Sequence, residues 1–81
     1  MICLTLCTKP QCSLCDVVRD VIEEARKQFS FELELRNILN DPEDYERYRH
    51  DIPVVLLDNR EIARHRSTLP QLLAALHEAA V

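Results

Sequence analysis

The sequence predicts a single α/β domain over residues 1–81, with the element order β-α-β-α-β-β-α and a four-stranded mixed sheet that has helices on both faces. Three observations predict it. Segments with helical periodicity alternate with short apolar segments, one segment is apolar at four successive positions, and 81 residues suffice for one domain with a small core. The first β-α-β should be a right-handed parallel unit, and the late β-β pair an antiparallel hairpin.

The first strand and the first helix are separated by Lys9-Pro10-Gln11. Residues 2–7 are mostly apolar, which is typical of a strand covered on both faces. From residue 14 the apolar residues follow helical spacing, so we expect an amphipathic helix of about four turns. Its apolar positions are Leu14, Val17, Val18, Val21, Ile22 and Ala25.

The middle of the chain predicts an edge strand and a short helix. Residues 30–36 alternate, and Phe31, Leu33 and Leu35 fall on one face, as in a half-buried strand. Asp41 then precedes Pro42 and two acidic residues. This order is typical of an N-cap, a proline at the first helical position and acids in the first turn, so a helix should run toward residue 50.

The last third predicts a hairpin and a final helix. Residues 54–57 are apolar at successive positions, as a central strand requires, and a second strand is expected from residue 60 to about 65. Between them Asp58-Asn59 can form a tight turn, since both residues tolerate positive φ. Thr68-x-x-Gln71 matches a capping box, followed by a helix whose buried face is made of Leu69, Leu72, Leu73 and Leu76.

Composition and charge exclude several function classes. The net charge of −4 gives no electrostatic reason to bind nucleic acid or an anionic membrane surface. No apolar run approaches the roughly 18 residues of a membrane span, and the first residues carry no basic leader, so we expect a cytoplasmic protein. The absence of glycine argues against a glycine-rich phosphate loop.

The motif Cys12-Ser13-Leu14-Cys15 is the main candidate site. In a reducing compartment, closely spaced cysteines are more often catalytic or metal-binding than structural. The motif stands at the predicted start of a helix, where free backbone N–H groups and the helix dipole stabilise a thiolate. Thiols at such positions have a pKa of roughly 3.5 to 7.5 instead of about 8.5. We therefore expect Cys12 to attack a disulfide and Cys15 to resolve the mixed disulfide.

The motif, the preceding strand, the following helix and Ile52-Pro53 before a hydrophobic hairpin resemble a small glutaredoxin-like protein of the thioredoxin superfamily. The resemblance implies a thioredoxin-like fold and a thiol–disulfide oxidoreductase that acts in electron transport and cell redox homeostasis. It also implies that Cys12 is the nucleophile, that Cys15 is the resolving residue, and that Lys9 helps to bind substrate. Pro53 would be cis and face the cysteines, and the Ile52 backbone would contact the substrate.

The sequence departs from typical glutaredoxins in the parts that hold glutathione. Those proteins carry a Gly-Gly pair and an acidic residue after the hairpin, whereas residues 62–68 here contain neither. Side chains at these positions prevent a close backbone approach, and Arg64 and Arg66 cannot replace a carboxylate that binds an ammonium group. We expect no bound cofactor. The substrate would be a disulfide-containing protein or a low-molecular-weight thiol, with thioredoxin reductase or, less favoured by these residues, glutathione as electron donor.

Three alternatives remain open. The chain could be a protein-binding module in which the fold presents Ile52-Pro53 and the cysteines have little redox activity. The spacing Cys7-x4-Cys12-x2-Cys15 also suits a cysteine-ligated zinc or iron–sulfur site, but it supplies only part of either pattern. Finally, the cysteines could all be ordinary core residues, which is our interpretation of Cys3 and Cys7. We predict no metal site, and His50, His65 and His77 form no ligand motif.

Overall fold

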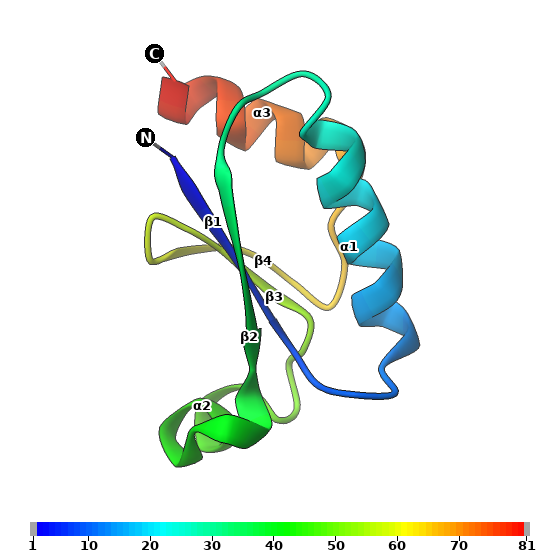
Figure 1. Ribbon diagram of the computed structural model, residues 1–81, viewed down its shortest axis with the longest axis vertical. Helices are drawn as coiled ribbons and strands as arrows, with labels where there is room; N and C mark the ends of the chain where they lie inside the picture. Colours follow the sequence, from blue (N-terminus) through cyan, green and yellow to red (C-terminus); the bar gives the residue numbers. More distant parts are fainter. Residues whose placement is uncertain (1, 81) are drawn as a thin grey trace.

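Figure 1 shows a computed structural model that describes residues 2–80, and its helices and strands follow the predicted order. The strands are β1 (Cys3–Thr8), β2 (Glu32–Asn37), β3 (Val54–Leu57) and β4 (Arg60–Arg64). The helices are α1 (Ser13–Ala25), α2 (Pro42–Tyr48) and α3 (Leu69–Ala80), and a short 3₁₀ turn, η1 (Ile38–Asn40), leads into α2. Met1 and Val81, the two ends of the predicted domain, lie outside the described residues.

The four strands form one mixed sheet in the order β2-β1-β3-β4. β1 pairs in parallel with β2, and β3 pairs antiparallel with β4, as predicted. β1 also pairs antiparallel with β3. All four residues of β3 are buried, which confirms a central strand. β2 is an edge strand, but Leu35 does not lie on a buried face. It is 45% exposed although it stands opposite Leu6, because an edge strand has a neighbour on one side only.

Two hydrophobic clusters lie on opposite faces of the sheet. The larger one joins α1 and α3 to the sheet, and the smaller one lies beneath η1 and α2 (Figure 1). Leu4 and Leu6 of β1 belong to the first cluster, whereas Cys7 belongs to the second, since successive residues of a strand point to opposite faces. The helices therefore cover both faces. Leu72 and Leu76 are fully buried in α3, while Leu69 and Leu73 are partly buried at its margin.

Side chains cap the two later helices as the sequence predicts. The Asp41 carboxylate accepts hydrogen bonds from the backbone N–H of Glu43, at 2.8 Å, and of Asp44, at 3.4 Å. Thr68 and Gln71 bond reciprocally, with the Gln71 N–H donating to the Thr68 hydroxyl at 3.3 Å and the Thr68 N–H donating to the Gln71 side chain at 3.4 Å. These contacts satisfy amide groups that the first turn of a helix leaves unpaired.

Among residues 2–80 of this glycine-free chain, four adopt positive φ: Gln11, Asp58, Asn59 and His65. Asp58 and Asn59 form the predicted tight turn between β3 and β4, with φ of 48° and 71°. The sequence analysis did not predict positive φ at Gln11 or His65, because only a few per cent of residues other than glycine adopt it. Both stand in loops that lead to the candidate site.

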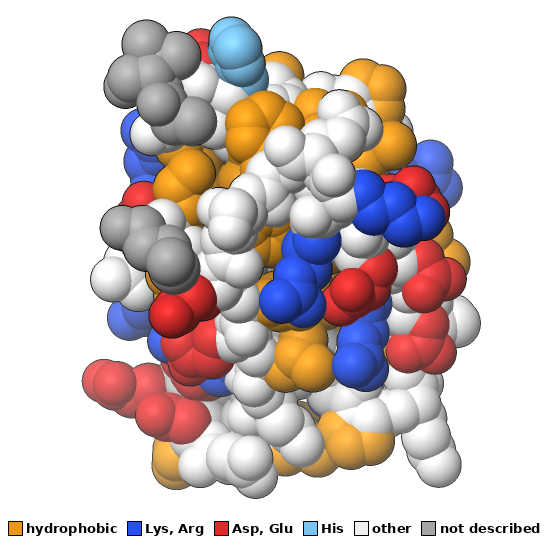
Figure 2. Space-filling view, turned by 45° about the horizontal axis from the view of Figure 1, so that its top comes forward, with side chains coloured by type: hydrophobic (Ala, Val, Ile, Leu, Met, Phe, Trp, Pro, Cys, Tyr) orange, Lys and Arg blue, Asp and Glu red, His pale blue; other side chains and the backbone are white. Residues whose placement is uncertain are grey.

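Acidic and basic side chains are intermingled on the face shown in Figure 2 and do not separate by sign. Exposed ion pairs also form within α1 and its C-terminal cap, among them Arg26 with Glu23 and Lys27 with Glu24. None of the helices formed by residues 2–80 is both long enough and apolar enough to cross a bilayer.

Candidate active site

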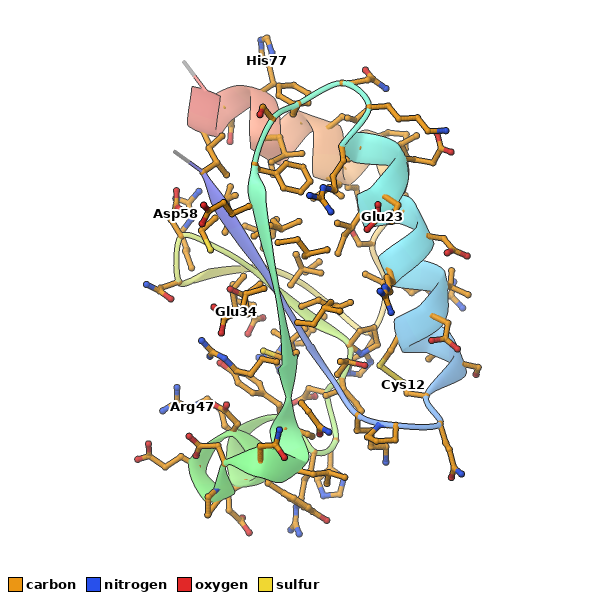
Figure 3. All side chains as sticks on the ribbon, viewed as in Figure 1. Cys12, Glu23, Glu34, Arg47, Asp58 and His77 are labelled. Atoms are coloured by element: carbon orange, nitrogen blue, oxygen red, sulfur yellow. A yellow bond between two sulfur atoms is a disulfide. The ribbon has the colours of Figure 1, made fainter. Side chains whose placement is uncertain are left out.

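Four chain segments meet at one end of the sheet. Cys7 near the end of β1 stands opposite Val54, and Val54 in turn stands opposite Arg64 at the end of β4. The carboxyl end of β1, the start of β3 and the end of β4 therefore lie side by side. The chain leaves β1 here and enters α1 at Cys12 (Figure 3). The paired cysteines, Ile52-Pro53 and the loop between β4 and α3 thus converge at this end.

Cys12 and Cys15 are placed at the start of α1 as the sequence predicts. The structure joins them in a disulfide, with Cα atoms 5.2 Å apart. Cys12 is the N-cap residue, and its sulfur accepts a hydrogen bond from the Cys15 backbone N–H at 3.3 Å. Cys15 is buried, with 3% of its surface exposed, whereas Cys12 is partly exposed. The outer sulfur therefore faces the solvent and also contacts the helix N-terminus, where negative charge is stabilised.

Ile52 and Pro53 are joined by a cis peptide bond, and Pro53 is fully buried. Ile52 is partly buried and packs against the smaller hydrophobic cluster. Among the described residues, neither the N–H nor the C=O of Ile52 has a hydrogen-bond partner, although the N–H of Asp51 and the C=O of Pro53 on either side are both bonded. A backbone segment with both groups free at the end of a sheet can pair with an extended chain.

Lys9 is exposed and lines a shallow pocket of about 260 Å³ beside α2. The other lining residues are Ile38, Leu39, Tyr45, Arg49 and His50. The structure thus places Lys9 with two further basic residues that the sequence analysis did not connect with the site. No periodic pattern links these positions, because they lie about 40 residues apart and meet only through the packing of α2.

A polar network holds Ile52-Pro53 against the end of β4. The Asp51 carboxylate contacts the Arg64 guanidinium at 3.0 Å and the His65 ring at 3.2 Å. Arg64 also donates to Glu61, and this hydrogen bond lowers the pKa of the Glu61 carboxyl and raises that of the Arg64 guanidinium. Finally, the backbone N–H of His65 donates to the backbone carbonyl of Pro53 at 2.7 Å.

An apolar groove of about 420 Å³ opens beside the cysteines, between α1 and the loop that follows β4. Its lining residues are Leu14, Val17, Val18, Val21, His65, Arg66, Ser67 and Thr68. Val18 is buried, but Leu14 and Val17 are 48% and 58% exposed, so the apolar face of the amphipathic helix α1 is buried only in part. Leu14 and Val17 thus belong to an apolar row of α1 that the core does not fully cover, and this row forms one wall of the groove.

The remaining cysteines lie outside this constellation. Cys7 is fully buried against Ile38 and Tyr48 on the sheet face opposite α1, and burial raises the pKa of its thiol to about 11. Cys3 is partly exposed at the start of β1, so it is less of a core residue than expected. Within residues 2–80, no three His, Cys, Asp or Glu side chains converge as metal ligands would.

Comparison with known proteins assigns a family to this arrangement. A family model described as a glutaredoxin-like domain matches residues 3–77, nearly the whole chain. Among solved structures, a structural-genomics target protein from X. campestris is 26% identical, with a TM-score of 0.79. The match covers 93% of this chain and 96% of that one.

Thioredoxins share the fold at lower identity. Thioredoxin 1 from Thermosipho africanus is 16% identical, with a TM-score of 0.63 over 98% of this chain and 99% of its own. A mutant thioredoxin from Halobacterium salinarum is 15% identical, with a TM-score of 0.61 over 96% of this chain and 70% of its own. These likenesses confirm the thioredoxin-like fold class predicted from the sequence.

Proposed function

The chain belongs to the glutaredoxin-like domain family of the thioredoxin superfamily, and from this membership and the paired cysteines we propose that it is a thiol–disulfide oxidoreductase with a dithiol mechanism. One observation carries the proposal. Cys12 caps α1, remains partly exposed, and accepts a hydrogen bond from the Cys15 N–H at 3.3 Å. This environment stabilises a thiolate where a substrate can reach it.

The proposed cycle starts from the reduced dithiol. The Cys12 thiolate attacks one sulfur of the substrate disulfide, forms a mixed disulfide with it and releases the other sulfur as a thiolate, which takes up a proton. Cys15 then loses its proton and attacks the Cys12 sulfur. The Cys12–Cys15 disulfide forms and the second substrate thiol leaves. Two electrons pass from the protein to the substrate, and an external thiol or dithiol reductant restores the protein.

The burial difference assigns the two roles. Cys15 is 3% exposed, so an external disulfide cannot approach its sulfur, whereas an internal attack on Cys12 needs no such access. Lys9, Ile52 and Pro53 are proposed as substrate-binding residues around Cys12. The unpaired N–H and C=O of Ile52 favour this role, because they can bond to the backbone next to a substrate cysteine.

A protein reductase suits this site better than glutathione as the electron donor. Where typical glutaredoxins have Gly-Gly, this chain has a loop with side chains, and its Arg64 already pairs with Asp51 and Glu61. We therefore propose a dithiol reductase of the thioredoxin reductase kind as donor. Turnover driven by NADPH and thioredoxin reductase should exceed turnover driven by glutathione and glutathione reductase, and the reverse order would contradict this assignment. Such chemistry also belongs in a reducing compartment, consistent with the expected cytoplasmic location.

Cysteine variants test the mechanism. Cys12→Ser should abolish disulfide exchange, because Cys15, the other thiol in the first turn of α1, is buried and out of reach of an external disulfide. Cys15→Ser should retain the first attack and accumulate a mixed disulfide with substrate, detected as a mass adduct on the Cys12 peptide. Cys3→Ser is the matched control, since Cys3 lies at the opposite end of β1, and it should react at the wild-type rate. Undiminished exchange by Cys12→Ser would refute the proposal and leave a binding module.

A further inference from the structure

The outer side of β2 is an edge of the sheet with unpaired backbone groups. β2 comes first in the strand order, and within residues 2–80 no strand pairs with its outer side. In Figure 1 it runs in front of the other strands, and no helix crosses it. The Glu32 N–H donates to the Ile2 carbonyl at 2.9 Å, toward β1, so the backbone N–H and C=O groups of Leu33 and Leu35 point outward. Such a row of groups can pair with another strand.

The two edges of the sheet differ in their regularity. β2 keeps an unbroken register with β1 over all six of its residues. β4, at the other edge, has a register shift between Val55 and Leu56 of its neighbour β3, and its Arg64 is already bound by Asp51. An irregularity of this kind twists an edge and hinders further pairing. Only β2 among the described strands therefore offers a regular, open edge.

The side chains of β2 complement a second copy of the same strand. In an antiparallel pair centred on Leu35, Leu35 stands opposite its own copy, and Glu34 stands opposite Arg36 twice by symmetry. The side chains of Glu34 and Arg36 are 53% and 32% exposed, and Leu35 is 45% exposed, so all three can reach a partner. Glu34 lies on the side of the sheet away from α1 (Figure 3), and Arg36 shares that face.

The charges also select one register. Within one copy, Glu34 and Arg36 lie 3.5 Å apart, so the pair centred on Leu35 would join four alternating charges in one network. A pair centred on Glu34 places this residue opposite its own copy, and a pair centred on Arg36 does the same for Arg36. A pair centred on Leu33 sets Glu32 against Glu34. Like charges directly opposite each other destabilise a strand pair, so the register centred on Leu35 is favoured.

We propose that two copies of this chain associate through β2, which pairs antiparallel with its own copy about Leu35 and joins two four-stranded sheets into one of eight strands. The cysteine site stays open, because Cys12 follows the carboxyl end of β1 and not its paired edge. Since β1 and β2 are parallel, the two-fold axis places the two Cys12 sites at opposite ends of the joined sheet. An interface of one short strand pair is small, so the dimer should dissociate on dilution.

Sedimentation velocity of the reduced protein, from about 10 μM to about 1 mM, tests the proposal with two charge reversals. The wild type should shift from monomer toward dimer as its concentration rises. Arg36→Glu and Glu34→Arg each set like charges opposite each other and should raise the dimer dissociation constant by about tenfold or more. An equimolar mixture of the two variants should dimerise where each alone is monomeric, because one variant is acidic at both positions and the other is basic at both.

Three controls keep the test independent of folding. Arg60→Glu is the matched control, because it makes the same charge change at an exposed position of β4 and should associate like the wild type. Leu35→Asp places two carboxylates opposite each other without changing an ion pair, and it should be monomeric with an unchanged far-UV circular dichroism spectrum. In the wild type, amide hydrogen exchange at Leu33 and Leu35 should slow as the concentration rises, whereas that of Glu32, already bonded to Ile2, should not.

The outcomes separate clearly. A wild type that remains monomeric at the highest concentration would overturn the inference. A dimer that persists in both charge-reversal variants would assign the association to another surface, and a mixture that fails to associate would exclude the register centred on Leu35, so either result also overturns it. Loss of the dimer in each variant and its return in the mixture supports the inference.

Discussion

The thiols of the reduced protein should differ in reactivity by a large factor that follows from their positions. Burial raises the pKa of Cys7 to about 11, so about one molecule in 10⁴ carries its thiolate at pH 7. Thiols at helix N-termini have pKa values of roughly 3.5 to 7.5, so a thiol at the start of α1 that falls anywhere in this range is at least about one quarter ionised at pH 7. Ionisation alone thus favours Cys12 by at least about 2,000-fold.

Part of this advantage is lost, because the thiolate of a more acidic thiol is a weaker nucleophile. With a Brønsted coefficient of about 0.45, a pKa difference of about 3.5 costs about 40-fold in rate. For a Cys12 pKa near the upper end of that range, we therefore expect Cys12 to be alkylated about 50-fold faster than Cys7 at pH 7, and the inaccessibility of Cys7 should widen the ratio.

The measurement is timed alkylation with iodoacetamide, quantified by peptide mass spectrometry from pH 4 to 10. The Cys15→Ser variant is the best starting material, because it cannot form the disulfide again but keeps the backbone N–H that bonds to the Cys12 sulfur. The apparent midpoint for Cys12 should lie at pH 7.5 or below in the folded protein, and near 8.5 after unfolding in urea. A folded-state midpoint at 8.5 or above would refute the argument from the helix N-terminus, and with it the role of Cys12 as nucleophile.

Three further predictions concern stability, each measured by urea unfolding. The raised pKa of Cys7 favours the folded state fully below pH 9, and this contribution to the free energy of unfolding, up to about 3 kcal/mol, should be lost as pH rises toward 11. Cys7→Ala should make the free energy of unfolding fall less steeply over this pH range. An equally steep fall in that variant would exclude Cys7 as its source. Asp41→Ala should cost about 1 kcal/mol by removing the cap of α2, whereas Asp41→Asn should keep most of it. Leu76→Ala, in the larger cluster, should cost about 2 to 5 kcal/mol, while Leu35→Ala at a half-exposed position should change stability far less; similar losses would contradict the burial assignment.

Local signals accounted for much of the fold. The Asp41-Pro42 start of α2, the Asp58-Asn59 turn and the pairing of Thr68 with Gln71 each depend on residues at most three positions apart, so the sequence alone predicts them. The four apolar residues of β3 likewise indicate a strand that is covered on both faces. The position of the paired cysteines at the start of α1 followed from the same kind of signal.

Local sequence signals cannot predict whether an apolar row of side chains is covered by another part of the chain. Periodicity places Val17 and Leu35 on apolar faces, but their exposure depends on neighbours that other parts of the chain supply. The contact between Asp51 and His65 joins residues 14 positions apart, just outside the two strands β3 and β4 that pair with each other. For this reason the groove and the polar network emerged only from the three-dimensional structure.

The loop before α3 contains no glycine, and this affects which ligands the loop can select. His65 occupies a left-handed conformation, with φ of 69°, which glycine adopts at no steric cost and which disfavours other residues by about 1 to 2 kcal/mol. Its N–H bond to the Pro53 carbonyl and its ring contact with Asp51 offset that cost. One residue of this loop thus has a backbone conformation that favours glycine, but side chains line the loop. A ligand at this loop meets the side chain of Arg66 in place of bare backbone, so selectivity here should depend on the side chains of the substrate.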